Sequence, residues 1–243
     1  MLDKEWFADW FNSKYYFLLY NKRNDDEAKL FINNLFSKIN LNKNSKVWDN
    51  ACGKGRHCKF ISQLGHFTTG TDLAENSISE AISFNYNNTE FFVHDMRLPF
   101  RFNYYDIVVN LFTSIGYFKK HSDNFSVFNS VYKALNPNGY FVIDFFNSNK
   151  VVNQLISNSN EVRENINFKI TKKIENNSIV KKIEFCADDK NFYFEEKVNL
   201  LKQDDFLSFA NTCGFKLVYK FGDYQLNDFN ENISDRLILI FKK

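Results

Sequence analysis

Residues 47–57 read VWDNACGKGRH, and this stretch decides the fold. An apolar run that ends at Asp49 is typical of a buried strand, and Arg56 begins a segment with helical periodicity. Gly53 and Gly55 lie between the two, where a backbone turns sharply and can approach a ligand closely. The chain has only 8 glycines and 2 prolines in 243 residues, so two glycines in one turn indicate a specific backbone geometry.

Strands and helices alternate on both sides of this turn. The apolar pattern predicts strands over 46–50, 67–72, 91–94, 105–111 and 140–146, and helices over 25–39, 56–64, 76–84 and 123–135. Such alternation is typical of a parallel sheet that is covered by helices on both faces. The predicted fold class is therefore α/β, with a Rossmann-like, doubly wound sheet.

The pattern changes after residue 147. Segments 166–175, 179–187 and 192–200 alternate with a period of two, which predicts a small antiparallel β-meander. A helix over 204–212 and strands over 215–221 and 236–241 follow, which completes seven strands in the main sheet, with the last one antiparallel. We expect residues 1–45 to form a helical lid, 46–150 with 201–243 to form the ligand-binding domain, and 151–200 to form an inserted β lid.

Acidic side chains follow successive strands of the predicted sheet. Asp72 ends the second strand, about 20 residues after the glycine turn, where a carboxylate can accept hydrogen bonds from both hydroxyls of a ribose. Asp95 comes directly after the third strand. Because the carboxyl ends of parallel strands meet at one edge of a sheet, these acids predict a nucleoside-containing ligand at that edge.

Together these motifs resemble those of the class I S-adenosylmethionine-dependent methyltransferases, in particular a bacterial small-molecule group. The resemblance extends over most of the chain. It includes the glycine turn, GTD at 70–72, DMR at 95–97, NLFTSIGYF at 110–118, LNPNG at 135–139, a tyrosine-rich segment at 15–23, and GDY at 222–224 followed by RLILIFKK at 236–243.

The resemblance implies S-adenosylmethionine as the cofactor and S-adenosylhomocysteine as its product. Asp72 would hold the ribose, Asp95 would face the adenine amine, and Gly53 and Gly55 would pack against the methionine moiety. The residues implied to bind the cofactor are Asp49, Ala51, Gly53, Gly55, Arg56, Asp72, Leu73, Asp95, Met96, Asn110, Leu111, Tyr16 and Arg23.

One position departs from the family pattern. Ala51 stands where the family has the first glycine of its G-x-G-x-G motif. Alanine restricts φ, so we expect the loop to keep its path if Ala51 has a negative φ.

Methyl transfer from a sulfonium mainly requires alignment and exclusion of water, so catalysis leaves little signature in a sequence. The candidates for handling a proton are Tyr117 and His121, and the candidates for contacting substrate are Tyr20, Tyr117, Asn147 and Arg236. His121 and Ser122 are, however, expected first of all to cap the helix that begins near Asp123. Tyrosines over 15–20 are also typical of a core.

Other functions stay open. NAD binds the same topology, although a bulky Arg56-His57 helix start disfavours its fingerprint. A non-catalytic S-adenosylmethionine-binding protein would be consistent with Ala51. A protein or RNA methyltransferase would need a basic groove, and a net charge of +2 does not indicate one.

The composition also bounds the setting of the protein. Four cysteines form no C-x-x-C pair, and the acidic N-terminus lacks the pattern of a signal peptide, which favours a reduced, cytoplasmic protein. We expect a small-molecule substrate, no nucleic acid, no membrane, no metal, and a monomer or homodimer.

Overall fold

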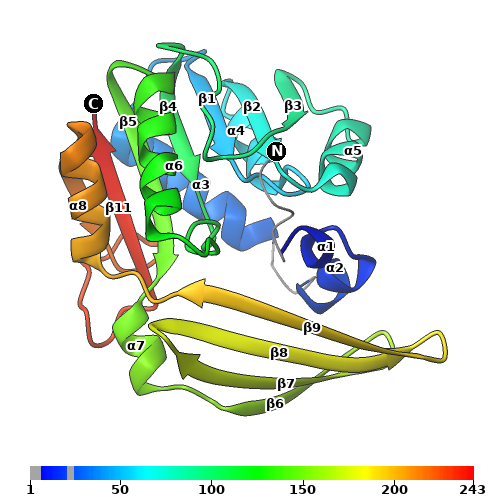
Figure 1. Ribbon diagram of the computed structural model, residues 1–243. Helices are drawn as coiled ribbons and strands as arrows, with labels where there is room; N and C mark the ends of the chain where they lie inside the picture. Colours follow the sequence, from blue (N-terminus) through cyan, green and yellow to red (C-terminus); the bar gives the residue numbers. More distant parts are fainter. Residues whose placement is uncertain (1–6, 21–24) are drawn as a thin grey trace.

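The computed structural model describes residues 7–20 and 25–243. These residues form two β-sheets (Figure 1). The larger has seven strands in the order β10-β11-β5-β4-β1-β2-β3, and the smaller has four in the order β6-β7-β8-β9.

The large sheet is the predicted doubly wound one. Its strands are β1 (Lys46–Asn50), β2 (Phe67–Asp72), β3 (Thr89–Val93), β4 (Tyr105–Asn110), β5 (Leu135–Phe146), β10 (Lys216–Phe221) and β11 (Arg236–Lys242). The pairings among β1 to β5 are parallel, whereas β11 pairs antiparallel with both β5 and β10. The predicted α/β fold with an antiparallel last strand is confirmed.

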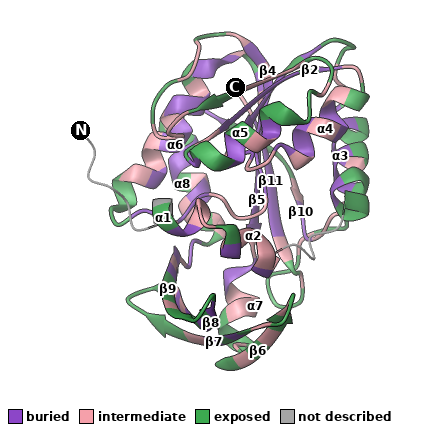
Figure 2. Ribbon diagram, turned by 90° about the vertical axis from the view of Figure 1, so that its right-hand side faces the viewer, coloured by how far each residue is buried: buried purple, intermediate pink, exposed green. Residues whose placement is uncertain are grey.

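Helices cover both faces of this sheet, and they are α3 (Asp25–Ile39), α4 (Arg56–Gln63), α5 (Glu75–Ser83), α6 (His121–Ala134) and α8 (Gln203–Cys213). The short helix α7 (Ser148–Asn153) follows the end of β5, next to the small sheet (Figure 1). Along β4, Ile107 and Val109 pack with Phe31 of α3, while Val108 packs with Phe128 of α6 on the opposite face. A run of consecutive apolar residues is thus buried on both sides, as expected for a central parallel strand. Figure 2 shows the central strands buried between these helices.

The small sheet contains one strand more than predicted. It consists of β6 (Asn158–Arg163), β7 (Ile166–Glu175), β8 (Ser178–Ala187) and β9 (Lys190–Asn199), all antiparallel. The β6 sequence, NSNEVR, has a single large apolar side chain, Val162, and that side chain is exposed. Because β6 buries little apolar surface, its sequence carries no alternating pattern from which a strand could be predicted.

Two short helices, α1 (Phe7–Phe11) and α2 (Lys14–Tyr20), lie between the two sheets (Figure 1). Trp10 and Leu19 pack against Phe168 and Ile183 of the small sheet. On the other side, the backbone amide of Asn76, in α5, donates to the Asn12 side-chain oxygen at 3.0 Å. The N-terminal helices therefore connect the small sheet to helix α5, beside the large sheet.

One helix boundary corrects a prediction. Helix α6 begins at His121, and its N-cap residue is Lys120, without a side-chain hydrogen bond. His121 and Ser122 therefore lie in the first turn of the helix and do not cap it. Over residues 7–20 and 25–243, none of the helices is long and apolar enough to span a membrane.

Candidate active site

A cavity of about 740 Å³ lies at the carboxyl ends of the parallel strands. One wall is the glycine turn with the residues after β2, and the opposite wall follows β4. Helices α1 and α2 and the residues Ile166 and Asp188 of the small sheet close the remaining sides. The cavity is thus formed by the large sheet and by both segments that were expected to act as lids.

Three residues of the glycine turn have left-handed backbone angles. Their φ values are 71° for Ala51, 56° for Gly53 and 77° for Gly55. Ala51 therefore does not have the negative φ that the sequence analysis gave as the condition for the loop to keep its path. The loop nevertheless keeps its course, because the amides of Ala51 and Cys52 both donate to the Thr71 carbonyl, at 2.8 and 2.9 Å. These two bonds hold Ala51 in a conformation that an alanine adopts only at a cost.

Gly55 is required for a second reason. A Cβ atom built at this position would lie 2.8 Å from the ring of Phe91, on β3. Both the left-handed φ and the close approach therefore exclude any side chain here. Gly53 has open space around it, and only its φ favours glycine.

Asp72 lies at the end of β2 and lines the cavity. Its Oδ2 accepts the amide of Gly53 at 2.8 Å, and its Oδ1 accepts the amide of Ala74 at 2.9 Å. Burial raises the pKa of Asp72, and the two amide donors oppose that rise. Each carboxylate oxygen has one backbone donor, so each keeps lone-pair capacity for a further donor from a ligand.

Asp95 and Met96 also line the cavity, after β3. The carboxylate of Asp95 accepts from Arg97 Nε at 3.0 Å and from Arg97 Nη2 at 2.7 Å. Arg97 in turn reaches Asp123 of α6 at 3.4 Å. A bidentate pair of this kind fixes the plane of the carboxylate, which makes Asp95 a rigid acceptor at the cavity wall.

Asp49 and Asn110 lie beneath the cavity and do not line it. Both are fully buried, and Asn110 Nδ2 donates to the Asn50 carbonyl at 2.9 Å. Burial raises the pKa of Asp49 to about 7, against the effect of the hydrogen bond from Cys58. Among residues 7–20 and 25–243, no hydrogen-bond partner is found for Asp49 Oδ1, Asn110 Oδ1 or either polar atom of the Asn50 side chain. These groups lie beneath the cavity as buried polar atoms with unused hydrogen-bonding capacity.

The tyrosine-rich segment contributes directly to the cavity. Tyr16 and Tyr20 both line it. The Tyr20 hydroxyl contacts both carboxylate oxygens of Glu196, on β9, at 2.7 and 2.8 Å, and Trp10 Nε1 donates to Glu196 at 2.6 Å. Burial, and next Glu196, raise the pKa of Tyr20 well above its ordinary value. Arg23, the remaining residue predicted in this segment, lies outside the described residues.

Some of the other residues predicted to bind the cofactor line the cavity, and others do not. Leu73, Arg56 and Leu111 line the cavity, whereas Gly55 lies behind the turn against Phe91. The sequence analysis missed His94, Phe112 and Thr113, which also line it. Phe112 and Thr113 belong to the NLFTSIGYF motif, so this motif could have identified them as cavity residues.

Of the predicted substrate and catalytic residues, Tyr117 lines the cavity with Tyr20. His121 is exposed and lies against Phe209, with the two ring centroids 4.9 Å apart. Asn147 caps α7, because its side chain accepts the Asn149 amide at 3.2 Å.

The fourth of these residues, Arg236, has a structural partner. Its Nε donates to the fully buried carboxylate of Asp144 at 2.7 Å. His121, Asn147 and Arg236 thus lie outside the cavity, which corrects the direct contacts expected of them. In the part of the chain that the structure describes, no three His, Cys, Asp or Glu side chains are grouped to hold a metal ion.

Residues 47–139 match the family model described as a methyltransferase domain. This span contains the glycine turn, Asp72, Asp95 and the post-β4 run. The resemblance to the class I S-adenosylmethionine-dependent methyltransferases is thereby confirmed for the domain and its fold.

The chain is similar to a putative methyltransferase, YqeM, of Bacillus subtilis, with 30% identity over 117 residues that make up 47% of each protein. The match thus spans about half the length of this curated relative. A solved S-adenosylmethionine-dependent methyltransferase of Clostridium acetobutylicum superposes with a TM-score of 0.80 at 18% identity, covering 96% of this chain and 98% of that one. The CcbJ methyltransferase of Streptomyces caelestis does so at 0.77 and 15%, covering 98% and 96%.

Proposed function

We propose that this chain transfers a methyl group from S-adenosylmethionine to a nitrogen or oxygen atom of a small molecule bound in the cavity. The observation that carries the proposal is the position of Asp72. Its carboxylate is tied to the glycine turn through Gly53, and its remaining acceptor capacity lies at the cavity.

The residues present fit the cofactor. Asp72 offers acceptors for the two ribose hydroxyls, and Asp95, held by Arg97, offers a fixed acceptor for an adenine amine. Met96 and Leu73 supply apolar surface in the same cavity, and Gly53 leaves space for close approach of a ligand. When bound, S-adenosylmethionine supplies a methyl group on a sulfonium whose leaving group is a neutral thioether.

The chain's own contribution is to align the acceptor and to exclude water. We assign the second task to helices α1 and α2 and to the small sheet, which belong to the two segments predicted as lids. Trp10 and Tyr20 meet on the buried carboxylate of Glu196, and Phe17 of α2 lies under Lys54 of the glycine turn, with Nζ 3.8 Å from the ring centroid. These contacts bridge the small sheet and the turn across the cavity.

Tyr117 is the group that we propose to handle the acceptor's proton. Its side chain lines the cavity, and its ring is held edge-on against Phe11 at 5.2 Å between centroids. An acceptor amine or hydroxyl must lose a proton as it gains a methyl group. A phenol hydroxyl next to the acceptor can relay that proton, accepting it on its oxygen while its own proton passes to water.

The names of structural relatives favour nitrogen as the acceptor. CalS10 of Micromonospora echinaspora is an amino pentose methyltransferase, and KedS8 of a Streptoalloteichus species is a sugar N-methyltransferase. MtfA is a glycopeptide N-methyltransferase. We therefore propose amines on sugar-containing small molecules as the first acceptors to test.

The test is turnover of S-adenosylmethionine with a panel of amino sugars, matched hydroxyl sugars and simple amines. We expect S-adenosylhomocysteine to accumulate with at least one amine and to require Tyr117, so that Tyr117→Phe lowers turnover but not cofactor affinity. Cofactor binding without turnover on any acceptor would instead favour a non-catalytic binding protein. The left-handed Ala51 is the observation that keeps this second function in view.

A further inference from the structure

The residues that follow β4 have an unusual backbone. Phe112 and Thr113 both have φ of 64°, in the left-handed region, and both line the cavity. Bulky and β-branched residues seldom adopt this region, and they keep it only where the surrounding structure determines it. The structure must therefore contain groups that hold these two residues.

Asp144, on β5, holds both. Its Oδ2 accepts the Phe112 amide at 2.8 Å, and its backbone carbonyl accepts the Thr113 amide at 2.9 Å. The Thr113 hydroxyl oxygen accepts from Arg236 Nη2 at 3.0 Å and from the Phe146 amide at 3.2 Å. Residues of β5 and β11 thus engage the amides of Phe112 and Thr113 and the Thr113 hydroxyl.

Asp144 is itself fixed by two side chains from the C-terminal part of the chain. Its Oδ1 accepts from Arg236 Nε at 2.7 Å, and its Oδ2 accepts from the Tyr224 hydroxyl at 3.0 Å. The carboxylate is fully buried, so both donors are needed to compensate its charge.

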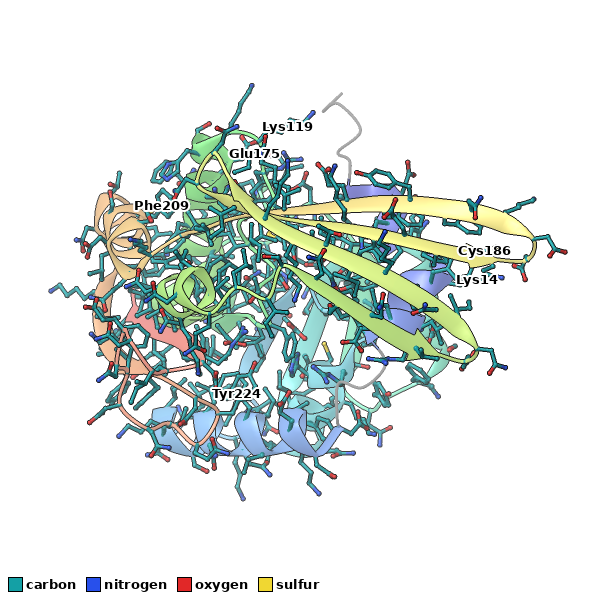
Figure 3. All side chains as sticks on the ribbon, turned by 90° about the horizontal axis from the view of Figure 1, so that it is seen from below. Lys14, Lys119, Glu175, Cys186, Phe209 and Tyr224 are labelled. Carbon is teal, nitrogen blue, oxygen red and sulfur yellow. The ribbon has the colours of Figure 1, made fainter. Side chains whose placement is uncertain are left out.

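Helix α3 fixes Tyr224 in turn. The Tyr224 ring stacks on Phe31 with centroids 4.5 Å apart, and its carbonyl accepts from Asn34 at 2.9 Å. Figure 3 shows Tyr224 on the loop that runs alongside this helix. The ring and the hydroxyl therefore have separate contacts, which allows one to be removed without the other.

We infer that Asp144, Tyr224 and Arg236 form a positioning network that holds Phe112 and Thr113 against the cavity. The inference rests on the proposed function, and it concerns residues that do not line the cavity themselves. It replaces the expected substrate contact of Arg236 with an indirect one. The network determines the shape of the wall along β4, and through that shape the affinity for the cofactor and the alignment of the acceptor.

Two variants test the network. Tyr224→Phe removes one donor and keeps the stacked ring, and Asp144→Asn keeps the size of the side chain and removes its charge. Phe209→Leu is the control, because Phe209, on α8, packs in the hydrophobic core away from the cavity. Its ring centroid lies 5.4 Å from that of Phe128. Amide hydrogen exchange of Phe112 and Thr113 and the affinity for S-adenosylhomocysteine are measured for all three and for the wild type.

We expect both amides to exchange about tenfold faster in Tyr224→Phe, and faster still in Asp144→Asn, with a loss of affinity of about tenfold. Phe209→Leu should lower the melting temperature while leaving both local measurements unchanged. Local exchange and affinity that change no more in the network variants than in Phe209→Leu would overturn the inference. If Asp144→Asn does not fold, Tyr224→Phe decides alone.

The two proposals fail separately. A wild-type protein that does not bind S-adenosylhomocysteine would refute the proposed function. The exchange measurement would then still decide the network: faster exchange at Phe112 and Thr113 supports it, and unchanged exchange overturns it.

Discussion

Asp72 at the end of β2 accepts the backbone amide of Gly53 at 2.8 Å, so the carboxylate proposed for the ribose and the glycine turn form one hydrogen-bonded unit. Asp72→Asn replaces one carboxylate oxygen by an NH₂ group, so that a donor faces the backbone amide of Gly53 or of Ala74. We expect it to weaken S-adenosylhomocysteine binding by about 1–3 kcal/mol, measured by calorimetric titration.

The matched control for Asp72 is Asp106→Asn. Asp106 also accepts a backbone amide, that of Lys46 at 2.9 Å, but at the opposite end of the strands. Its variant should retain wild-type affinity. Equal affinity losses in the two variants would show that Asp72 acts only through the fold.

Ala51 is strained, so Ala51→Gly should stabilise the protein. A left-handed φ costs an alanine about 1–2 kcal/mol in the folded state. Glycine has more conformational freedom in the unfolded chain, which lowers the stability of the variant by about 0.4–1 kcal/mol. The expected gain in unfolding free energy is up to about 1.6 kcal/mol, measured by urea denaturation. Ala74→Gly is the control, because Ala74 has φ of −80° and should lose stability. A destabilised Ala51→Gly would contradict the assigned conformation.

Asp49 should make stability depend on pH in an identifiable window. Burial raises its pKa to about 7 in the folded state, whereas the unfolded value is about 3.9. Between these values the folded state binds a proton that the unfolded state has lost, so the contribution of Asp49 to stability is fully present below about pH 4 and is lost as pH rises through about 7. The loss is at most about 4 kcal/mol.

Asp49→Asn removes this contribution and isolates it from that of Asp72, whose pKa burial also raises. The unfolding free energies of the two proteins, measured from pH 4 to pH 8, should therefore diverge, with the wild type losing more stability as pH rises. Parallel curves would mean that Asp49 is ionised throughout.

Glu196 joins both N-terminal helices to the small sheet. Glu196→Gln turns one acceptor of the Trp10 and Tyr20 donors into a donor, and we expect faster dissociation of S-adenosylhomocysteine in stopped-flow measurements together with a stability loss of about 1–3 kcal/mol. Glu195→Gln, one residue along β9 and exposed, is the control. An unchanged dissociation rate for Glu196→Gln would show that the Glu196 contacts do not keep the cavity closed.

The sequence predicted the sheet because its strands have strong local signals. Ile107 to Val109 are continuously apolar, and the glycine turn supplies a backbone that few residues allow. Strand β6 and helix α7 were not predicted, because β6 buries little apolar surface and α7 is only 6 residues long. Elements with a strong local pattern could therefore be predicted from the sequence, and elements with a weak one could not.

The site divides along the same line. Gly53, Asp72 and Asp95 lie at strand ends, and topology alone brings strand ends together at one edge. Arg236 and Asn147 also follow or begin strands, but their side chains engage Asp144 and the Asn149 amide, and these pairings depend on contacts distant in the chain or on a short unpredicted helix. Which way such a side chain points is decided by its tertiary partner, and no local pattern encodes it.

Calorimetric titration of the pure protein with S-adenosylhomocysteine and with NAD shows whether the cavity binds S-adenosylmethionine. We predict saturable one-to-one binding of S-adenosylhomocysteine, weakened by Asp72→Asn and undisturbed by excess NAD. Tight NAD binding with no heat from S-adenosylhomocysteine would contradict this prediction.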